Sequence, residues 1–240
     1  MSFTLLTLVF GFVILSSAYP APEAKGLLDS NDIKGKLDTG KGQEMFPIES
    51  YQSPPEVAKL FPYYLTGYDE EDRPIGVIDL GKWDARSWAK KGKEAWDDLE
   101  RHAEKMLYIL KAGVHAKNFT DESNVTRTVT DELGLIVDFD GFSVAQATNP
   151  KVVTFLTKFL GKLQLIQHRL SYAYFINVNA VASALVRLLR PALGSAFERI
   201  EVYGTRTSDW IPVLRRNLPA DALPEKYGGK AGHKPLVFYG

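Results

Sequence analysis

The sequence predicts an α/β domain with a mostly parallel sheet and flanking helices. Short apolar runs alternate with amphipathic stretches, the run at 133–139 is apolar almost throughout, and 240 residues suffice for one domain with a core. Strands joined by helices form parallel sheets with right-handed crossovers. We therefore expect strands near residues 75–80, 133–139, 172–178 and 200–203.

The helices are predicted from apolar residues that recur every three or four positions. This spacing favours helices over 88–110, 150–163, 181–193 and 209–218. Asn149 precedes the second of them and is followed by proline, an arrangement typical of a helix start. The alternation of strands and helices therefore extends to residue 218.

The amino terminus resembles a signal peptide. Residues 5–15 are almost wholly apolar, and small residues follow at 16–18. This pattern predicts a signal peptide over 1–18 with cleavage after Ala18. The run is shorter than the roughly 20 residues that span a bilayer. An uncleaved membrane anchor is the alternative.

Composition divides the rest of the chain into three parts. Residues 19–50 are rich in Pro, Gly, Lys and Asp without an apolar period, which predicts a flexible N-terminal segment. Residues 51–232 form the expected globular domain, and 233–240 are expected to be a C-terminal tail. No internal repeat is evident.

Two glycosylation sequons lie six residues apart in a polar stretch. They begin at Asn118 and Asn124 and end in threonine. Together with the signal peptide, they predict a secreted glycoprotein.

Several classes of function lack support in the sequence. The formal net charge is zero, which argues against a nucleic-acid partner, and there is no cysteine. The four histidines are scattered, so we expect no metal and no cofactor. Neither a nucleophile elbow nor a phosphate-binding glycine loop is present. Asp138 and Asp140 could form a catalytic pair in a hydrolase, although a polar strand end that caps the next loop is the preferred interpretation.

Six short motifs occur in order between residues 51 and 232. They lie at 54–75 (with the turn YDEEDRP), 81–84 (GKWD), 136–143 (IVDFDGFS), 175–179 (FINVN), 188–193 (LLRPAL) and 223–229 (LPEKYGG). Together they resemble the CRAL-TRIO lipid-binding family, which includes phosphatidylinositol/phosphatidylcholine transfer proteins and tocopherol and retinaldehyde carriers. The resemblance implies an apolar pocket that is floored by the sheet and closed by a movable gate helix.

By position in the motif order, the gate helix is the one expected over 181–193. Apolar residues are expected on its inner face: Val181, Leu185, Leu188 and Leu189 as the gate residues, with Ala184 beside them. Arg187 and Arg190 are expected to face the membrane, because such a helix can meet anionic headgroups. A plain core helix with a solvated arginine face is the alternative.

The predicted lipid contacts are drawn from the strands, the gate and one arginine. They are Ile136, Tyr174, Ile176, Leu185, Leu189 and Arg199. Ordinary core packing is the alternative for each apolar member. Gln167-His168-Arg169 stands where inositol-phosphate binders of the family carry Pro-Glu-Arg, which argues against phosphatidylinositol.

The sequence thus predicts a secreted, non-enzymatic protein that holds a phospholipid or other small hydrophobic molecule and exchanges it during transient contact with membranes. The alternative is a secreted interaction module with the same fold and no functional cavity.

Overall fold

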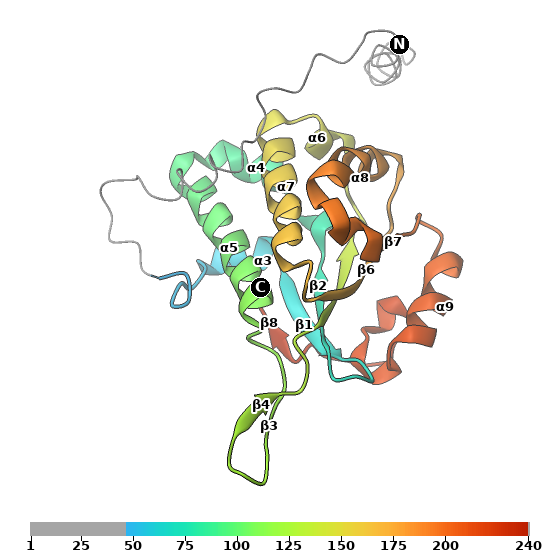
Figure 1. Cartoon of the computed structure of the whole chain (residues 1–240). Coiled ribbons are helices and arrows are strands. Elements are labelled where there is room, and N and C mark those ends of the chain that lie inside the picture. The colour runs from blue at the N-terminus through green and yellow to red at the C-terminus, as the bar shows by residue number, and fades with distance from the viewer. Residues whose placement is uncertain (1–46, 240) are drawn as a thin grey trace, which may run out of the picture. The chain divides into compact units, whose positions relative to one another are not determined.

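The computed structural model describes residues 47–239 (Figure 1). The predicted signal peptide and nearly all of the 19–50 segment lie outside the described residues. Prediction and structure can therefore be compared from residue 47 onward.

A six-stranded sheet in the order β7-β6-β5-β2-β1-β8 organises the domain. Its strands are β1 Tyr63–Tyr68, β2 Pro74–Ile78, β5 Leu133–Asp138, β6 Leu170–Ile176, β7 Ile200–Val202 and β8 Val237–Phe238. Strands β2, β5, β6 and β7 are parallel, whereas β1 and β8 add in antiparallel fashion. The predicted mostly parallel α/β fold is confirmed.

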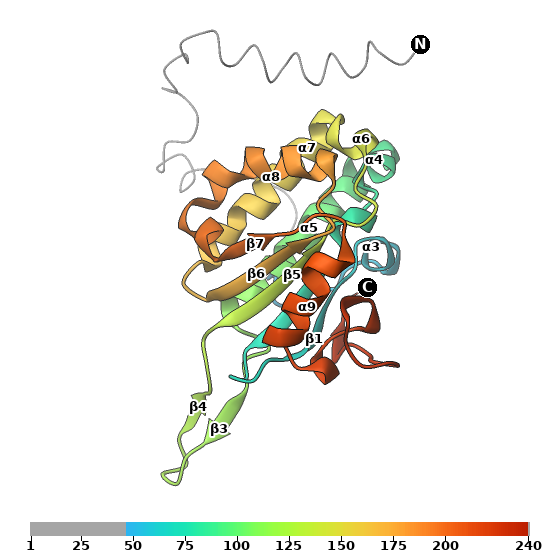
Figure 2. The ribbon, with the colours of Figure 1, turned by 90° about the vertical axis from the view of Figure 1, so that its right-hand side faces the viewer.

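The helices cover both faces of this sheet (Figures 1 and 2). They are α3 Pro55–Leu60, α4 Ala85–Trp88, α5 Lys93–Ala112, α6 Val144–Ala147, α7 Pro150–Gly161, α8 Ala180–Leu193 and α9 Thr207–Asn217. Helices α5, α7 and α8 pack on one face, and α9 packs on the other. Asn149 caps α7 as expected, since its Oδ1 accepts hydrogen bonds from two backbone N–H groups of the first turn.

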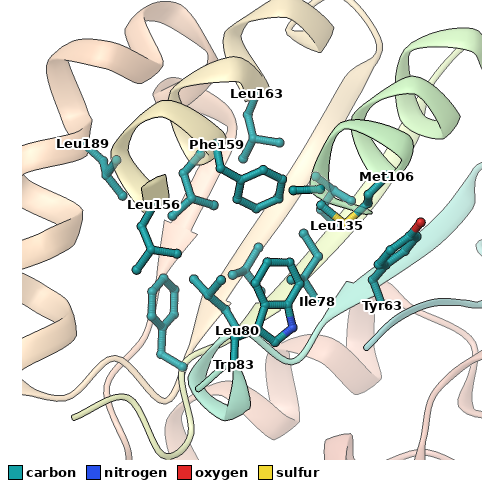
Figure 3. Packing of buried hydrophobic residues seen from close by; sticks show 14 of the residues in the cluster. Tyr63, Ile78, Leu80, Trp83, Met106, Leu135, Leu156, Phe159, Leu163 and Leu189 are labelled. Carbon is teal, nitrogen blue, oxygen red and sulfur yellow. The ribbon is translucent and has the colours of Figure 1, made fainter. Parts of the chain in front are cut away.

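The central strands supply two separate cores. On β5, Leu135 and Val137 enter the core beneath α5, α7 and α8, while Ile136 enters the core beneath α9. This division follows from the pleat, because successive side chains of a strand point to opposite faces. Figure 3 shows Leu135 among aromatic and aliphatic side chains of the larger core, including Phe159 and Met106.

Four segments differ from the prediction. The helix expected over 88–110 is interrupted at Gly92, whose φ of 103° separates α4 and the turn after it from α5. Residues 63–68 form β1, which is buried on both faces for most of its length and therefore shows no alternation in sequence. The expected C-terminal tail contains β8, which pairs with β1. The expected loop around the sequons contains the hairpin of β3 (Asn118–Thr120) and β4 (Thr126–Thr128), which projects from the sheet and helices (Figures 1 and 2).

The acidic turn between β1 and β2 is built around the buried carboxylate of Asp69. Its Oδ1 accepts hydrogen bonds from the backbone N–H groups of Glu71 and Arg73, at 3.0 and 2.9 Å. Its Oδ2 accepts from Arg73 Nε at 2.6 Å and from the Tyr172 hydroxyl on β6 at 2.8 Å. The Tyr172 side chain passes over Gly134 on the intervening strand β5 to contact Asp69. A side chain at position 134 would block this path, since a Cβ there would lie 2.2 Å from the Tyr172 ring.

His102 fixes the first described segment against α5. The imidazole is buried, its Nδ1 lies 2.6 Å from Ser53 Oγ, and its Nε2 lies 2.8 Å from the carbonyl oxygen of Phe61. A neutral ring satisfies both contacts, with Nε2–H as the donor to Phe61 and Nδ1 as the acceptor from Ser53. Burial lowers the pKa of His102 below its ordinary value of 6.5.

We predict that acid destabilises the domain through this histidine. The unfolded chain binds the proton more readily than the folded chain, so the free energy of unfolding falls as the pH drops below about 6.5. Denaturant unfolding between pH 7.5 and 5.0 measures the slope. His102→Gln should reduce the slope and leave the part that arises from His115, whose pKa burial also lowers. An unchanged slope in this variant would contradict the assignment.

Candidate functional site

A small cavity lies between α5 and the strands β1, β2 and β5. Its volume is about 40 Å³, and its lining is mostly apolar, with Met106 and Ile109 from α5 and Leu133 and Leu135 from β5. Gly76 on β2 keeps the wall open, since a Cβ there would lie 2.9 Å from a methyl group of Leu135. This space could hold about three water molecules, whereas ligand pockets typically measure roughly 300–1,000 Å³.

Arg169 provides the cationic part of the cavity wall. It directly precedes β6, and its side chain is 13% exposed. The guanidinium lies against Gly113, where an added Cβ would be 2.2 Å from Nη2. Its Nε has no hydrogen-bond partner among residues 47–239, and its ion pair with Asp131 spans 3.8 Å. The cavity therefore combines apolar walls with a poorly paired, largely buried positive charge.

Two aromatic residues and a histidine complete another part of the wall. Tyr239, directly after β8, stacks on Tyr63 with ring centroids 4.9 Å apart. The Tyr239 hydroxyl lies 2.8 Å from His115 Nε2. Burial lowers the pKa of His115, which favours the neutral imidazole.

Helix α8 occupies the position expected of the gate and packs firmly on the sheet. Leu185 and Leu189 are buried in the same core as Leu135, and Figure 3 shows Leu189 near Leu156. No residue of α8 lines the cavity described above. In the part of the chain that the structure describes, residues 180–199 are long and apolar enough to cross a membrane, and about a third of this stretch is buried.

The outer face of α8 differs from the prediction at two residues, since Ala184 and Leu188 are both exposed. Leu188 is 56% exposed and lies on the same side as Arg187, whereas Val181 is half-buried. The inward stripe follows Ala182, Leu185, Val186, Leu189 and Leu193. Leu188 falls outside this stripe because it is six residues from Ala182, which at about 100° per residue places it roughly 120° around the helix from Ala182. Arg187 and Arg190 are exposed.

The predicted lipid contacts do not form one group. Ile136, Tyr174 and Ile176 belong to the core under α9, on the opposite face of the sheet from Leu185 and Leu189. Successive side chains of a strand point to opposite faces of the sheet, and the sequence does not show which face meets α8. Residues of the two faces were therefore grouped together. Arg199 is exposed, and its Nη1 donates to the carbonyl oxygen of Gln167, away from the cavity lining.

A buried polar cluster lies at the carboxyl ends of β2 and β5. The Tyr227 hydroxyl lies 3.0 Å from Asp79 Oδ1 and 2.8 Å from Asp138 Oδ2. Lys226 Nζ lies 2.6 and 3.6 Å from the same two oxygens. Burial raises the pKa of Tyr227 well above its ordinary range, so the phenol stays protonated.

The remaining oxygen of Asp138 is also occupied. Its Oδ1 accepts hydrogen bonds from the backbone N–H of Asp140 at 2.9 Å and from Asn177 Nδ2 at 2.8 Å. This geometry favours the loop-capping interpretation of Asp138 over a catalytic one. Sequence reasoning missed Asp79 and Tyr227, although Asp79 directly follows the apolar strand β2, much as Asp138 ends the apolar strand β5. Within residues 47–239, no group of three potential metal ligands is present.

Comparison with known proteins gives consistent matches. The model of the CRAL/TRIO domain family matches residues 58–229. A "SEC14 cytosolic factor" of Yarrowia lipolytica is 28% identical over 190 residues, which cover 77% of this chain and 36% of that protein. A "SEC14 cytosolic factor" of Kluyveromyces lactis is 24% identical over 210 residues, which cover 87% of this chain and 66% of that protein. The chain thus spans less than two thirds of the length of these relatives.

A solved structure shares the fold. The crystal structure of Sfh5 superposes with a TM-score of 0.54 at 19% identity, covering 78% of this chain and 62% of that chain. At this identity the likeness concerns the architecture of sheet and helices.

We predict that Tyr227→Phe destabilises the domain by about 1–3 kcal/mol, because two buried carboxylates lose a shared donor. Denaturant unfolding at pH 7 measures this loss. Tyr203→Phe is the matched control, since the Tyr203 hydroxyl donates to the exposed Glu201. Equal effects of the two substitutions would show that the cluster contributes no special stability.

Proposed function

Because the chain belongs to the CRAL-TRIO family, we propose that it binds a hydrophobic lipid inside this domain and exchanges it at membrane surfaces. The observation that carries the proposal is the family match over residues 58–229, on a domain whose cavity has mostly apolar walls. The similarity to the two proteins named SEC14 cytosolic factor supports the same proposal. Binding without catalysis is part of the proposal, since the oxygens of the buried carboxylate Asp138 are engaged in structural hydrogen bonds.

The physical need for such a carrier follows from the hydrophobic effect. Each methylene group exposed to water costs about 0.8 kcal/mol, so two acyl chains with on the order of thirty methylenes cost roughly 24 kcal/mol. Spontaneous desorption is therefore very slow. A carrier with an apolar interior that opens at the membrane turns transfer into an exchange between two similar environments.

Lipid binding requires the described packing to open. A cavity of about 40 Å³ cannot hold a phospholipid. We propose that α8 separates from the sheet at the membrane, as a gate. Exposed Leu188 and the exposed arginines Arg187 and Arg190 suit contact with an anionic lipid surface, because apolar and cationic groups both favour the interface.

An interaction module without a functional lipid site is the second candidate. The close packing of Leu185 and Leu189 against the sheet favours it. Native mass spectrometry of the purified protein, followed by lipid extraction, separates the two candidates. A stoichiometric lipid supports the carrier, whereas a protein that stays empty and takes up no fluorescent lipid supports the module.

Secretion with N-glycosylation is also proposed. The β3–β4 hairpin supports it, since Asn118 and Asn124 are both exposed there. Asn124 adopts a left-handed conformation with φ 64° in the turn. The carboxylate of Asp121 orders this turn by accepting hydrogen bonds from the backbone N–H groups of Ser123 and Val125.

We predict that charge reversal on α8 slows lipid transfer. Arg187→Glu combined with Arg190→Glu should reduce transfer to vesicles that contain phosphatidylserine at least tenfold, because each basic residue contributes about 1 kcal/mol at such a surface. A fluorescence transfer assay measures the rate. Arg215→Glu with Arg216→Glu on α9 is the control and should change it little. Equal losses in both variants would contradict a role for α8.

We predict that secretion from animal cells adds a glycan at each sequon. Treatment with an N-glycosidase should increase electrophoretic mobility, and Thr120→Val and Thr126→Val should each remove one of two glycans. Valine keeps the β-branched shape that suits the strands. Retention of the unmodified protein inside the cells would contradict the proposed localisation.

A further inference from the structure

We propose that the cavity between α5 and the sheet receives the acyl chain of a fatty acid whose carboxylate pairs with Arg169. The inference rests on the proposed lipid-binding function and specifies the class of lipid. Three observations carry it: the burial of the guanidinium, the weakness of its present pairing and its place in the wall of an apolar cavity.

The charge of Arg169 lacks a matching partner in the structure. Its only ion pair within residues 47–239 is with Asp131, at 3.8 Å, and that carboxylate is 81% exposed. The buried Nε has no acceptor in this part of the chain. A largely buried charge ordinarily has close counter-ions and hydrogen bonds. The carboxyl end of α5, capped at Gly113, offers only the partial negative charge of the helix dipole.

A carboxylate fits this position by charge and shape. Guanidinium and carboxylate groups form two parallel charge-assisted hydrogen bonds, which would engage the unpaired donor. Arg169 is the one permanently charged side chain among the residues that line this cavity. His115 also lines it, but burial lowers the pKa of His115, which favours the neutral imidazole. A phosphate monoester carries a charge of about −1.5 to −2 at pH 7 and would need a second cation. One carboxylate matches one arginine.

The apolar part of the cavity accounts for the tail of the ligand. Met106, Ile109, Leu133 and Leu135 form a wall that continues from the guanidinium. The present volume of about 40 Å³ must grow to admit a chain. One wall is held by short elements: β8 has only two residues, and Tyr239 beyond it is held by one backbone hydrogen bond to Tyr63, ring contacts with Tyr63 and His115, and one hydroxyl contact. Displacement of Tyr239 opens the cavity along the edge of the sheet.

The test compares three ligands that share one chain. Delipidated full-length protein is titrated at pH 8 with oleic acid, oleyl alcohol and oleoyl lysophosphatidic acid, and binding is followed by displacement of a fluorescent fatty alcohol. Oleic acid should bind at least about tenfold more tightly than oleyl alcohol, as expected of a charge-assisted hydrogen bond. Arg169→Gln should abolish this preference. Arg206→Gln, in an exposed arginine paired with Asp209 on the other face of the sheet, should retain it.

Each outcome has a defined meaning. Equal affinity of the native protein for the acid and the alcohol overturns the role of Arg169 and leaves lipid binding intact. If lysophosphatidic acid binds more tightly than oleic acid, the proposal of a carboxylate ligand is wrong and the site prefers a phosphate headgroup. Binding of none of the three lipids overturns this inference, whereas the proposed function fails only if native mass spectrometry also finds the protein without a co-purifying lipid. If circular dichroism shows that Arg169→Gln does not fold, the comparison of acid and alcohol in the native protein decides.

Discussion

Burial of the central strands on both faces is the constraint on which the other features depend. Every residue of β5 is buried, and its side chains alternate between the core under α5, α7 and α8 and the core under α9. A shift of register by one residue would exchange these two sets. The sheet therefore fixes simultaneously which helices lie on each side, where α8 packs and which residues face the cavity.

Two-sided burial confines charged groups to the strand ends, where distant parts of the chain neutralise or bind them. Asp69 follows β1 and accepts a hydrogen bond from Tyr172. Asp79 follows β2, Asp138 is the last residue of β5, and both contact Tyr227. In both clusters, a tyrosine reaches from a separate segment to a buried carboxylate. These contacts attach the first turn and the closing LPEKYGG segment to the sheet. Arg169 also stands at a strand end, but it lacks an equally close partner among the described residues.

The sequence predicted the parts of the fold that depend on local periodicity. Apolar runs located β2, β5, β6 and β7, and helical spacing located α7 and α8. Strand β1 escaped prediction because burial on both faces removes alternation, and β8 because two residues carry no pattern.

The candidate site was less predictable, since it depends on which face of each strand meets which helix. Ile136 and Leu185 were grouped as lipid contacts, although the sheet lies between them. The cavity beside Arg169 forms where α5, β2 and β5 pack together, and no local sequence pattern predicts that these three elements are neighbours. The partners of Tyr227 are separated from it by 148 and 89 residues, and tertiary packing alone brings them together.

The pairing of β8 with β1 has a consequence for handling the protein. Without residues 236–239, the part of β1 at Tyr63, Tyr64 and Leu65 would present unpaired N–H and C=O groups along a buried, largely apolar strand. Such an edge pairs readily with another chain and promotes aggregation. Proteolytic loss of residues 236–239 during purification would thus endanger solubility, and their presence becomes a criterion of sample quality.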